Sequence, residues 1–178
     1  MGAYGDAGAV ITRKPDLAEK IRKLSDHGRV DKYVHDIIGY NHRLDALQAA
    51  ILSVKLKYLS QWTARRRQVA AYYDDCLRNL GVKYVVPEHN SNPVYHLYVI
   101  EVDEREKLQK KLEEHGIASG IHYPVPLHLQ PAFKDYGYSK GDFPVTELFS
   151  KRILSLPICG SLTDSEVEYI CSKLKILL

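Results

Sequence analysis

The stretch GYNHRLDALQAA (residues 39–50) marks the change from a polar, aromatic segment to a helix, and the rest of the chain is interpreted from it. Residues 29–42 show neither helical nor strand periodicity, so they are predicted to form a functional loop. From Arg43 onward, apolar side chains recur at helical spacing and mark one face of a helix: Leu44, Leu47, Ile51, Val54 and Tyr58. The small side chains of Ala49 and Ala50 would let another element approach that helix closely.

The region before this stretch is predicted to contain a strand and a helix. Residues 2–9 are punctuated by glycine, and the apolar residues 9–12 that follow are typical of a buried strand. Pro15 suits the first turn of a helix and Gly28 suits the residue after its end, which predicts a helix over residues 15–26. A chain that opens with a buried strand is expected to be part of a longer protein.

Beyond the stretch, a further helix is expected over residues 59–79, because a stop signal follows at residues 79–81. Two strands are then predicted, over residues 84–86 and 95–102, and Asp103 with Glu106 forms the pattern of a capping box for the next helix. These elements indicate two parts: residues 1–79, and a small α+β domain over residues 80–178.

The last third of the chain opens with an extended segment, residues 117–128. Pro124 and Pro126 exclude a central strand, so the segment should lie at an edge or line a cleft. Thr163 and Glu166 form a second capping box pattern, which predicts a terminal helix.

The composition of the chain excludes several classes of protein. The chain of 178 residues is 45% hydrophobic and carries a net charge of +3. It contains no run near the roughly 20 apolar residues that a membrane span needs and no signal peptide pattern, so a cytoplasmic protein is expected. The three cysteines are widely spaced, which fits a reducing compartment. The basic run at residues 65–67 is interpreted as a solvated helix face and not as a nucleic-acid site.

Two histidines, His122 and His128, flank Tyr123 and the prolines of the extended segment. Two histidines could bind a metal ion, but no third ligand stands at a recognisable spacing, so no metal site is predicted. Hydrogen bonding to a substrate and a structural role both remain open for each histidine.

Three groups of residues together resemble the DegT/DnrJ/StrS-type sugar aminotransferases, in order and in approximate spacing. They are residues 2–9 (GAYGDAGA), residues 39–50, and residues 122–124 (HYP) with His128, residues 130–131 (QP) and residues 154–157 (LSLP). The resemblance implies an α/β fold: the remainder of a fold-type-I pyridoxal-phosphate transferase large domain, followed by the small α+β domain.

The resemblance also implies the cofactor and its ligands. Family members bind pyridoxal phosphate through a Schiff-base lysine, which by this alignment falls two positions before Met1, so this chain alone is expected to be inactive. Asn41 corresponds to the asparagine that reaches the cofactor phosphate of the neighbouring subunit, which implies a homodimer; the alternative is that Asn41 caps the following helix. Arg43 would bind phosphate or substrate, or form a salt bridge with Asp45 or Asp36.

His122, Tyr123 and His128 are the implied contacts to the substrate. The implied reaction transfers an amino group, typically from glutamate, to a keto-sugar attached to a nucleotide. Two alternatives stay open: a dehydratase on the same scaffold with histidine in place of the lysine, and a short non-catalytic protein that binds a sugar-nucleotide or a partner, or regulates a longer homologue.

Overall fold

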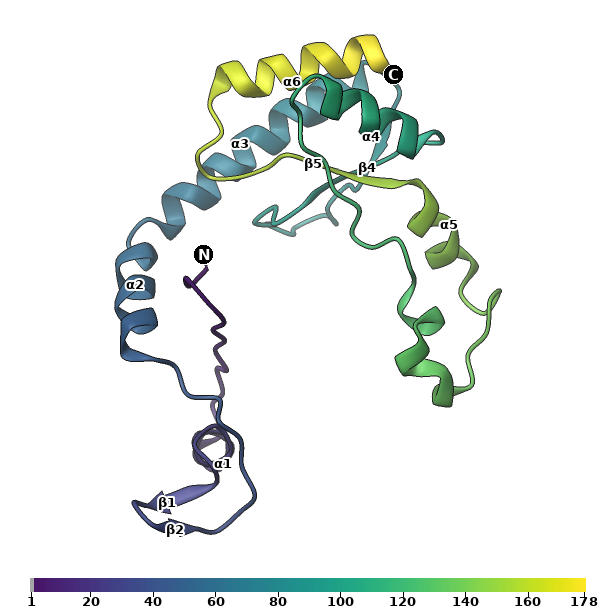
Figure 1. Cartoon of the computed structure of the whole chain (residues 1–178). Helices are drawn as coiled ribbons and strands as arrows, with labels where there is room; N and C mark the ends of the chain where they lie inside the picture. The colour runs from purple at the N-terminus through teal and green to yellow at the C-terminus, as the bar shows by residue number, and fades with distance from the viewer. Residues whose placement is uncertain (1) are drawn as a thin grey trace. The chain divides into compact units, whose positions relative to one another are not determined.

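The computed structural model describes residues 2–178, and the chain divides into two compact units, Met1–Leu59 and Ser60–Leu178 (Figure 1). The division falls directly after the first residue of helix α3 (Leu59–Arg78), because the buried residues of α3 belong to the core of the second unit. The domain boundary at residues 79 and 80 concerns the intact protein and stays a prediction.

The first unit contains two helices and a short antiparallel hairpin. Helix α1 (Pro15–Ser25) begins at the predicted proline, and Asp26 is its C-cap. Strands β1 (Arg29–Asp31) and β2 (Val34–His35) pair within the segment predicted to be an irregular loop, so that prediction was wrong in part. Helix α2 (Ala46–Leu56) begins three residues later than Arg43.

The strand predicted over residues 9–12 does not form. No strand in residues 2–178 pairs with this segment, and its side chains face solvent, with Ile11 97% exposed. Apolar and β-branched composition favours an extended backbone, but a strand also requires a neighbour that takes its hydrogen bonds.

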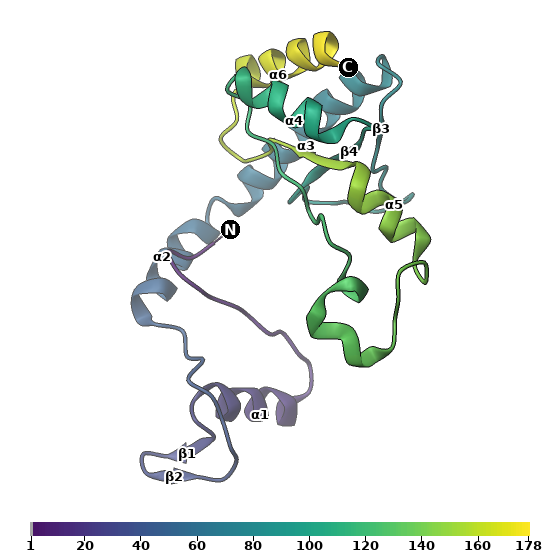
Figure 2. The ribbon, with the colours of Figure 1, turned by 45° about the vertical axis from the view of Figure 1, so that its right-hand side comes forward.

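The second unit is a three-stranded antiparallel sheet with helices on one face (Figures 1 and 2). The strand order is β3 (Lys83–Tyr84), β4 (Tyr98–Glu101), β5 (Ile153–Leu156). Helices α3, α4 (Arg105–Glu114) and α6 (Asp164–Leu177) contribute the core with the inner residues of β4 and β5. Short 3₁₀ helices η1 (Leu127–Leu129) and η2 (Pro131–Tyr136) precede helix α5 (Pro144–Arg152), which leads into β5.

The two capping predictions had opposite outcomes. Thr163 and Glu166 form the full capping box at the start of α6, as predicted. At α4 the N-cap is Glu104 and no side chain caps the helix, so the pattern at Asp103 was misleading. The Asp103 carboxylate pairs instead with the guanidinium of Arg152, a charged group that outcompetes a backbone amide for it.

The extended segment 117–128 lies at the edge of the sheet, as expected from its prolines. Gly120 and Ser155 exchange two backbone hydrogen bonds, of 3.1 and 2.7 Å, which attach the segment to β5. Its last residues coil into η1, so His128 stands on a helical turn and not on extended chain.

Candidate functional site

Asn41 lies on a backbone segment that is fixed from both sides. The amide of Tyr40 donates to the carbonyl of Leu24 at 2.7 Å, and the amide of His42 donates to the carbonyl of Ser25 at 2.9 Å. The Asn41 side chain is exposed, and no hydrogen bond joins it to any residue within 2–178. The N-cap of α2 is Asp45, so the alternative that Asn41 caps this helix was wrong.

Two glycines make this arrangement possible. A Cβ atom on Gly39 would stand 2.0 Å from the backbone nitrogen of Gly28, and a Cβ atom on Gly28 would stand 1.7 Å from the carbonyl oxygen of Ile37. Gly28 also has a φ of +74°, in the region that favours glycine. The chain leaving α1 therefore passes directly against the chain approaching Asn41.

Arg43 forms an ion pair with neither of the two carboxylates expected. Its Nη1 lies 3.0 Å from Oδ1 of Asp26, whose Oδ2 accepts from Arg29 at 2.6 Å, while Asp36 pairs with Lys23. The hydrogen bond from Arg29, and then that from Arg43, lowers the pKa of the Asp26 carboxyl. Asp26 therefore stays charged at neutral pH and holds both guanidinium groups near the segment that carries Asn41.

This cluster fits the phosphate group of a cofactor. An unengaged amide and a guanidinium that is half exposed are both donors, and phosphate oxygens are acceptors. Tyr40 and His42 stack with ring centroids 5.3 Å apart on the same segment, which restricts its motion. The cluster therefore fits a phosphate group by the chemistry of its hydrogen-bond donors. The amide of Asn41 and the guanidinium of Arg43 can both bind an anion, and the backbone that carries them is held by hydrogen bonds.

His122 and Tyr123 line a cavity of about 610 Å³ in the second unit, between the extended segment and α5. Nδ1 of His122 lies 2.9 Å from the hydroxyl of Ser155 in β5, which orients the imidazole. Tyr123 is 71% exposed. The rest of the lining is mostly apolar: Pro124, Val125, Pro126, Leu127, Gln130, Val145, Thr146, Phe149, Ser150 and Ile153.

His128 is not among the residues that line this cavity. Its Nε2 lies 3.0 Å from Oε1 of Glu147, its ring packs against Phe143, and its side chain is only 7% exposed. The amide of Gly141, and then the imidazole of His128, lowers the pKa of the Glu147 carboxyl. The structure therefore brings His122 and Tyr123 together and engages His128 in packing against α5.

Sequence reasoning missed the role of the three consecutive arginines of α3. Arg66 donates to the carbonyls of Tyr95 and Ile158 at 3.0 Å each, and Arg67 donates to the carbonyl of Pro93 at 3.0 Å. Arg65 donates to the carbonyl of Leu162 at 2.8 Å. The run is therefore not a solvated face. The sequence of a charged run does not show which backbone carbonyls, from loops distant in the chain, will lie within hydrogen-bonding distance of it.

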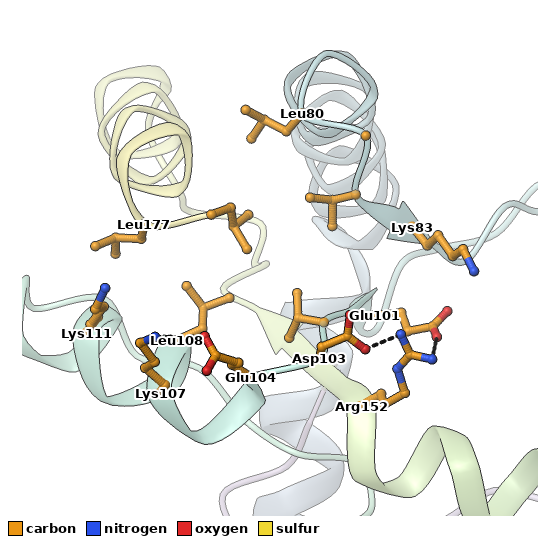
Figure 3. A pocket seen from close by; sticks show the side chains of 14 residues that line it. Leu80, Lys83, Glu101, Asp103, Glu104, Lys107, Leu108, Lys111, Arg152 and Leu177 are labelled. Atoms are coloured by element: carbon orange, nitrogen blue, oxygen red, sulfur yellow. Dashed lines mark hydrogen bonds and ion pairs between the residues drawn. The ribbon is translucent and has the colours of Figure 1, made fainter.

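A second cavity in this unit, of about 510 Å³, is lined by apolar and charged side chains, and several of the charged ones pair with one another (Figure 3). Arg152 pairs with Glu101 at 3.0 Å and with Asp103, and Lys107 lies 2.8 Å from Glu104.

Within residues 2–178 there is no group of three histidine, cysteine or acidic side chains that could hold a metal ion. No helix in the described part of the chain is long and apolar enough to cross a membrane.

The chain matches the DegT/DnrJ/EryC1/StrS aminotransferase family over residues 1–175. It is 44% identical over 177 residues to the pleiotropic regulatory protein of Geobacillus stearothermophilus, across 98% of this chain and 48% of that protein. It is 41% identical over 159 residues to the dTDP-3-amino-3,4,6-trideoxy-alpha-D-glucose transaminase of Streptomyces venezuelae, across 89% and 42%.

Among solved structures, the crystal structure of S. venezuelae DesV in complex with a ketimine intermediate matches with a TM-score of 0.94 and 38% identity. The match covers 98% of this chain and 47% of that one. The chain thus spans about half the length of the curated relatives it matches.

Proposed function

Because the chain belongs to the DegT/DnrJ/EryC1/StrS aminotransferase family, we propose that it supplies the C-terminal half of a pyridoxal-phosphate-dependent sugar aminotransferase. The intact enzyme would transfer an amino group from an amino-acid donor, glutamate, to a keto-sugar linked to a nucleotide. The observation that carries this proposal is the match to sugar aminotransferases over nearly the whole chain. The fold class is confirmed: the chain matches part of aminotransferase structures, with TM-scores of 0.94 and 0.91.

In this proposal Asn41 donates its side-chain amide to a phosphate oxygen of the cofactor bound by the neighbouring subunit of a homodimer. The unengaged amide and the ordered backbone of residues 40–42 support that role. Arg43 adds positive charge beside it while Asp26 holds the guanidinium in place. Pyridoxal phosphate, when bound, would supply the electron sink for amino-group transfer.

We further propose that His122 and Tyr123 contact the sugar-nucleotide. The imidazole of His122 is oriented by Ser155, and the phenol of Tyr123 is exposed at the cavity, so both can hydrogen-bond to an incoming hydroxyl group. The substrate contact predicted for His128 stays a prediction. Its bond to Glu147 supports a different contribution, which is to hold η1 against α5.

The first test is to sequence the gene upstream of the Met1 codon. The proposal predicts an in-frame lysine two codons before it, which would supply the Schiff-base amine that this chain alone is expected to lack. Histidine at that position would favour the dehydratase. An in-frame stop codon upstream, with a ribosome-binding site for the Met1 codon, would contradict the proposal that the chain is part of an enzyme.

The second test uses the intact protein with pyridoxal phosphate, glutamate and a nucleotide-linked keto-sugar, and measures 2-oxoglutarate formation. Asn41→Ala should weaken cofactor retention, followed by its absorbance after dialysis, and Asn41→Gln should retain part of it. His122→Ala should raise KM for the sugar-nucleotide and leave cofactor retention unchanged. Equal cofactor retention in the wild type and in Asn41→Ala would refute the phosphate role of Asn41.

One observation favours a second candidate. The relative in Geobacillus stearothermophilus carries the name of a regulatory protein, so a non-catalytic regulator is the alternative. The amino-transfer assay separates the two, because a regulator forms no 2-oxoglutarate. The aminotransferase proposal also predicts a cytoplasmic homodimer that binds neither nucleic acid nor membranes.

A further inference from the structure

Two of the three cysteines lie in the core of the second unit, on helices that run side by side. Cys76 stands on α3 and Cys171 on α6, and they are 6% and 4% exposed. The thiol of Cys76 lies 3.8 Å from the backbone carbonyl oxygen of Cys171. Figures 1 and 2 both show α3 and α6 next to each other on the helical face of this unit.

The Cys76 thiol also affects the thiol of Cys171. Burial, and then the neighbouring Cys76 thiol, raises the pKa of the Cys171 thiol to about 12. The Cys171 thiol is therefore protonated at neutral pH while the core is closed, and neither cysteine forms a disulfide. Cys159 differs, since it is partly exposed on the segment between β5 and α6.

We propose that Cys76 and Cys171 are a modification site that closes to a disulfide under a peroxide, fastening α6 to α3. One thiolate attacks the peroxide O–O bond, and its sulfur becomes a sulfenic acid as one water leaves. The second thiol then displaces the sulfenic hydroxyl as a second water and forms the S–S bond. Two thiols and one hydrogen peroxide thus give one disulfide and two waters.

Access to the pair requires a local opening, because neither thiol is exposed in the closed core. Helix α6 is the element expected to open, since it buries only one face, with Val167, Ile170, Cys171 and Leu174, and most of its other residues are exposed. The reaction should therefore be slow in buffer and faster in mild urea, which increases the open population.

The experiment uses the whole chain with Cys159→Ser, treated with hydrogen peroxide and digested by trypsin without reductant. That substitution is needed because residues 153–173 form one tryptic peptide that contains both Cys159 and Cys171. The expected product is this peptide joined to residues 68–78, with the loss of two hydrogen atoms, and separated again by a reductant. The melting temperature of the oxidised chain should rise by roughly 5 °C.

The double variant Cys76→Ser/Cys159→Ser is the matched control, and it should give neither the linked peptide nor the higher melting temperature. If Cys159→Ser impairs folding, cleavage after Glu166 or Glu168 separates the two cysteines in the unsubstituted chain. The proposal is overturned if the folded chain keeps both thiols free under peroxide while the urea-unfolded chain forms the link.

Discussion

The two units of this chain use similar apolar helical stripes and bury them to very different extents. In residues 2–59 only Gly28 is buried, and on α2 the side chains of Leu47 and Val54 are 72% and 57% exposed. On α6 the corresponding stripe is closed, with Val167 and Leu174 at 2% and 0%. A stripe thus identifies the face of a helix that can be buried, whereas the surrounding chain decides whether it is.

The two units are also stabilised by different kinds of interaction. The first unit is held by backbone hydrogen bonds between residues 24–27 and 40–42 and by the ion pairs of Asp26. The second unit has a continuous core that includes Tyr73, whose hydroxyl donates to the carbonyl of Pro157 at 2.8 Å. Burial of apolar area is the larger stabilising contribution, so the second unit should carry most of the free energy of unfolding.

The largest expected effect on stability comes from truncating one helical leucine in each unit, a buried one and an exposed one. Leu112→Ala removes a fully buried side chain and should lower the free energy of unfolding by about 2–5 kcal/mol. Leu47→Ala, on the exposed stripe of α2, should change it by less than about 0.5 kcal/mol. Urea denaturation followed by circular dichroism measures both. Equal losses would show that the comparison between the units is wrong.

A smaller effect is expected from the arginines of α3. Arg66→Met leaves the carbonyls of Tyr95 and Ile158 without their donor and should cost about 1.5–3 kcal/mol in urea denaturation. Arg78→Met, in the same helix, removes exposed contacts with Tyr84 and Asp75 and should cost clearly less than Arg66→Met. If both variants lose the same stability, the loop carbonyls do not depend on Arg66.

The capping box of α6 should contribute less again. Thr163→Ala removes the hydroxyl that accepts from the amide of Glu166, and should cost about 1 kcal/mol. Thr163→Ser keeps a hydroxyl and should retain most of that stability. Thermal unfolding of the three proteins at one pH measures the order, and a Ser variant as unstable as the Ala variant would contradict it.

The smallest effect is the pH dependence at Glu147. Its folded pKa lies below the ordinary value of 4.5, so its contribution to stability is present above pH 4.5 and is lost as pH falls through the folded pKa. Urea midpoints between pH 3 and pH 6 should therefore fall on acidification, and Glu147→Gln should make the curve flatter. An unchanged curve would show that the bonds from Gly141 and His128 leave stability insensitive to this carboxyl.

Local signals in the sequence predicted much of this fold. Pro15 placed the start of α1, and Thr163 with Glu166 placed the start of α6, because both depend on residues close in sequence. Residues 9–12 failed since a strand depends on a distant neighbour. Strand β5 was not predicted from the pattern of residues 153–156, which lies directly after α5 without a turn residue between them.

The site residues themselves stay a prediction, but the structure shows contacts around them that the sequence did not predict. Asn41 and Arg43 were proposed from the resemblance, and the structure pairs Arg43 with Asp26, which lies 17 residues earlier in the chain. Spacing favoured the nearer acids Asp45 and Asp36, yet only the backbone pairing of residues 24–27 with 40–42 decides which carboxylate lies within reach.

The contact between Gly28 and Gly39 has a consequence for how this protein can change over generations. A methyl group at either position collides with main-chain atoms, and no side-chain substitution elsewhere can shorten a backbone to make room. Random mutagenesis should therefore return no functional variant at either position, while the tip of the hairpin at Lys32 and Tyr33, which is exposed, accepts many residues. Sequence variation in this unit is thus expected to concentrate at the tip of the hairpin, while the glycines at positions 28 and 39 are both retained.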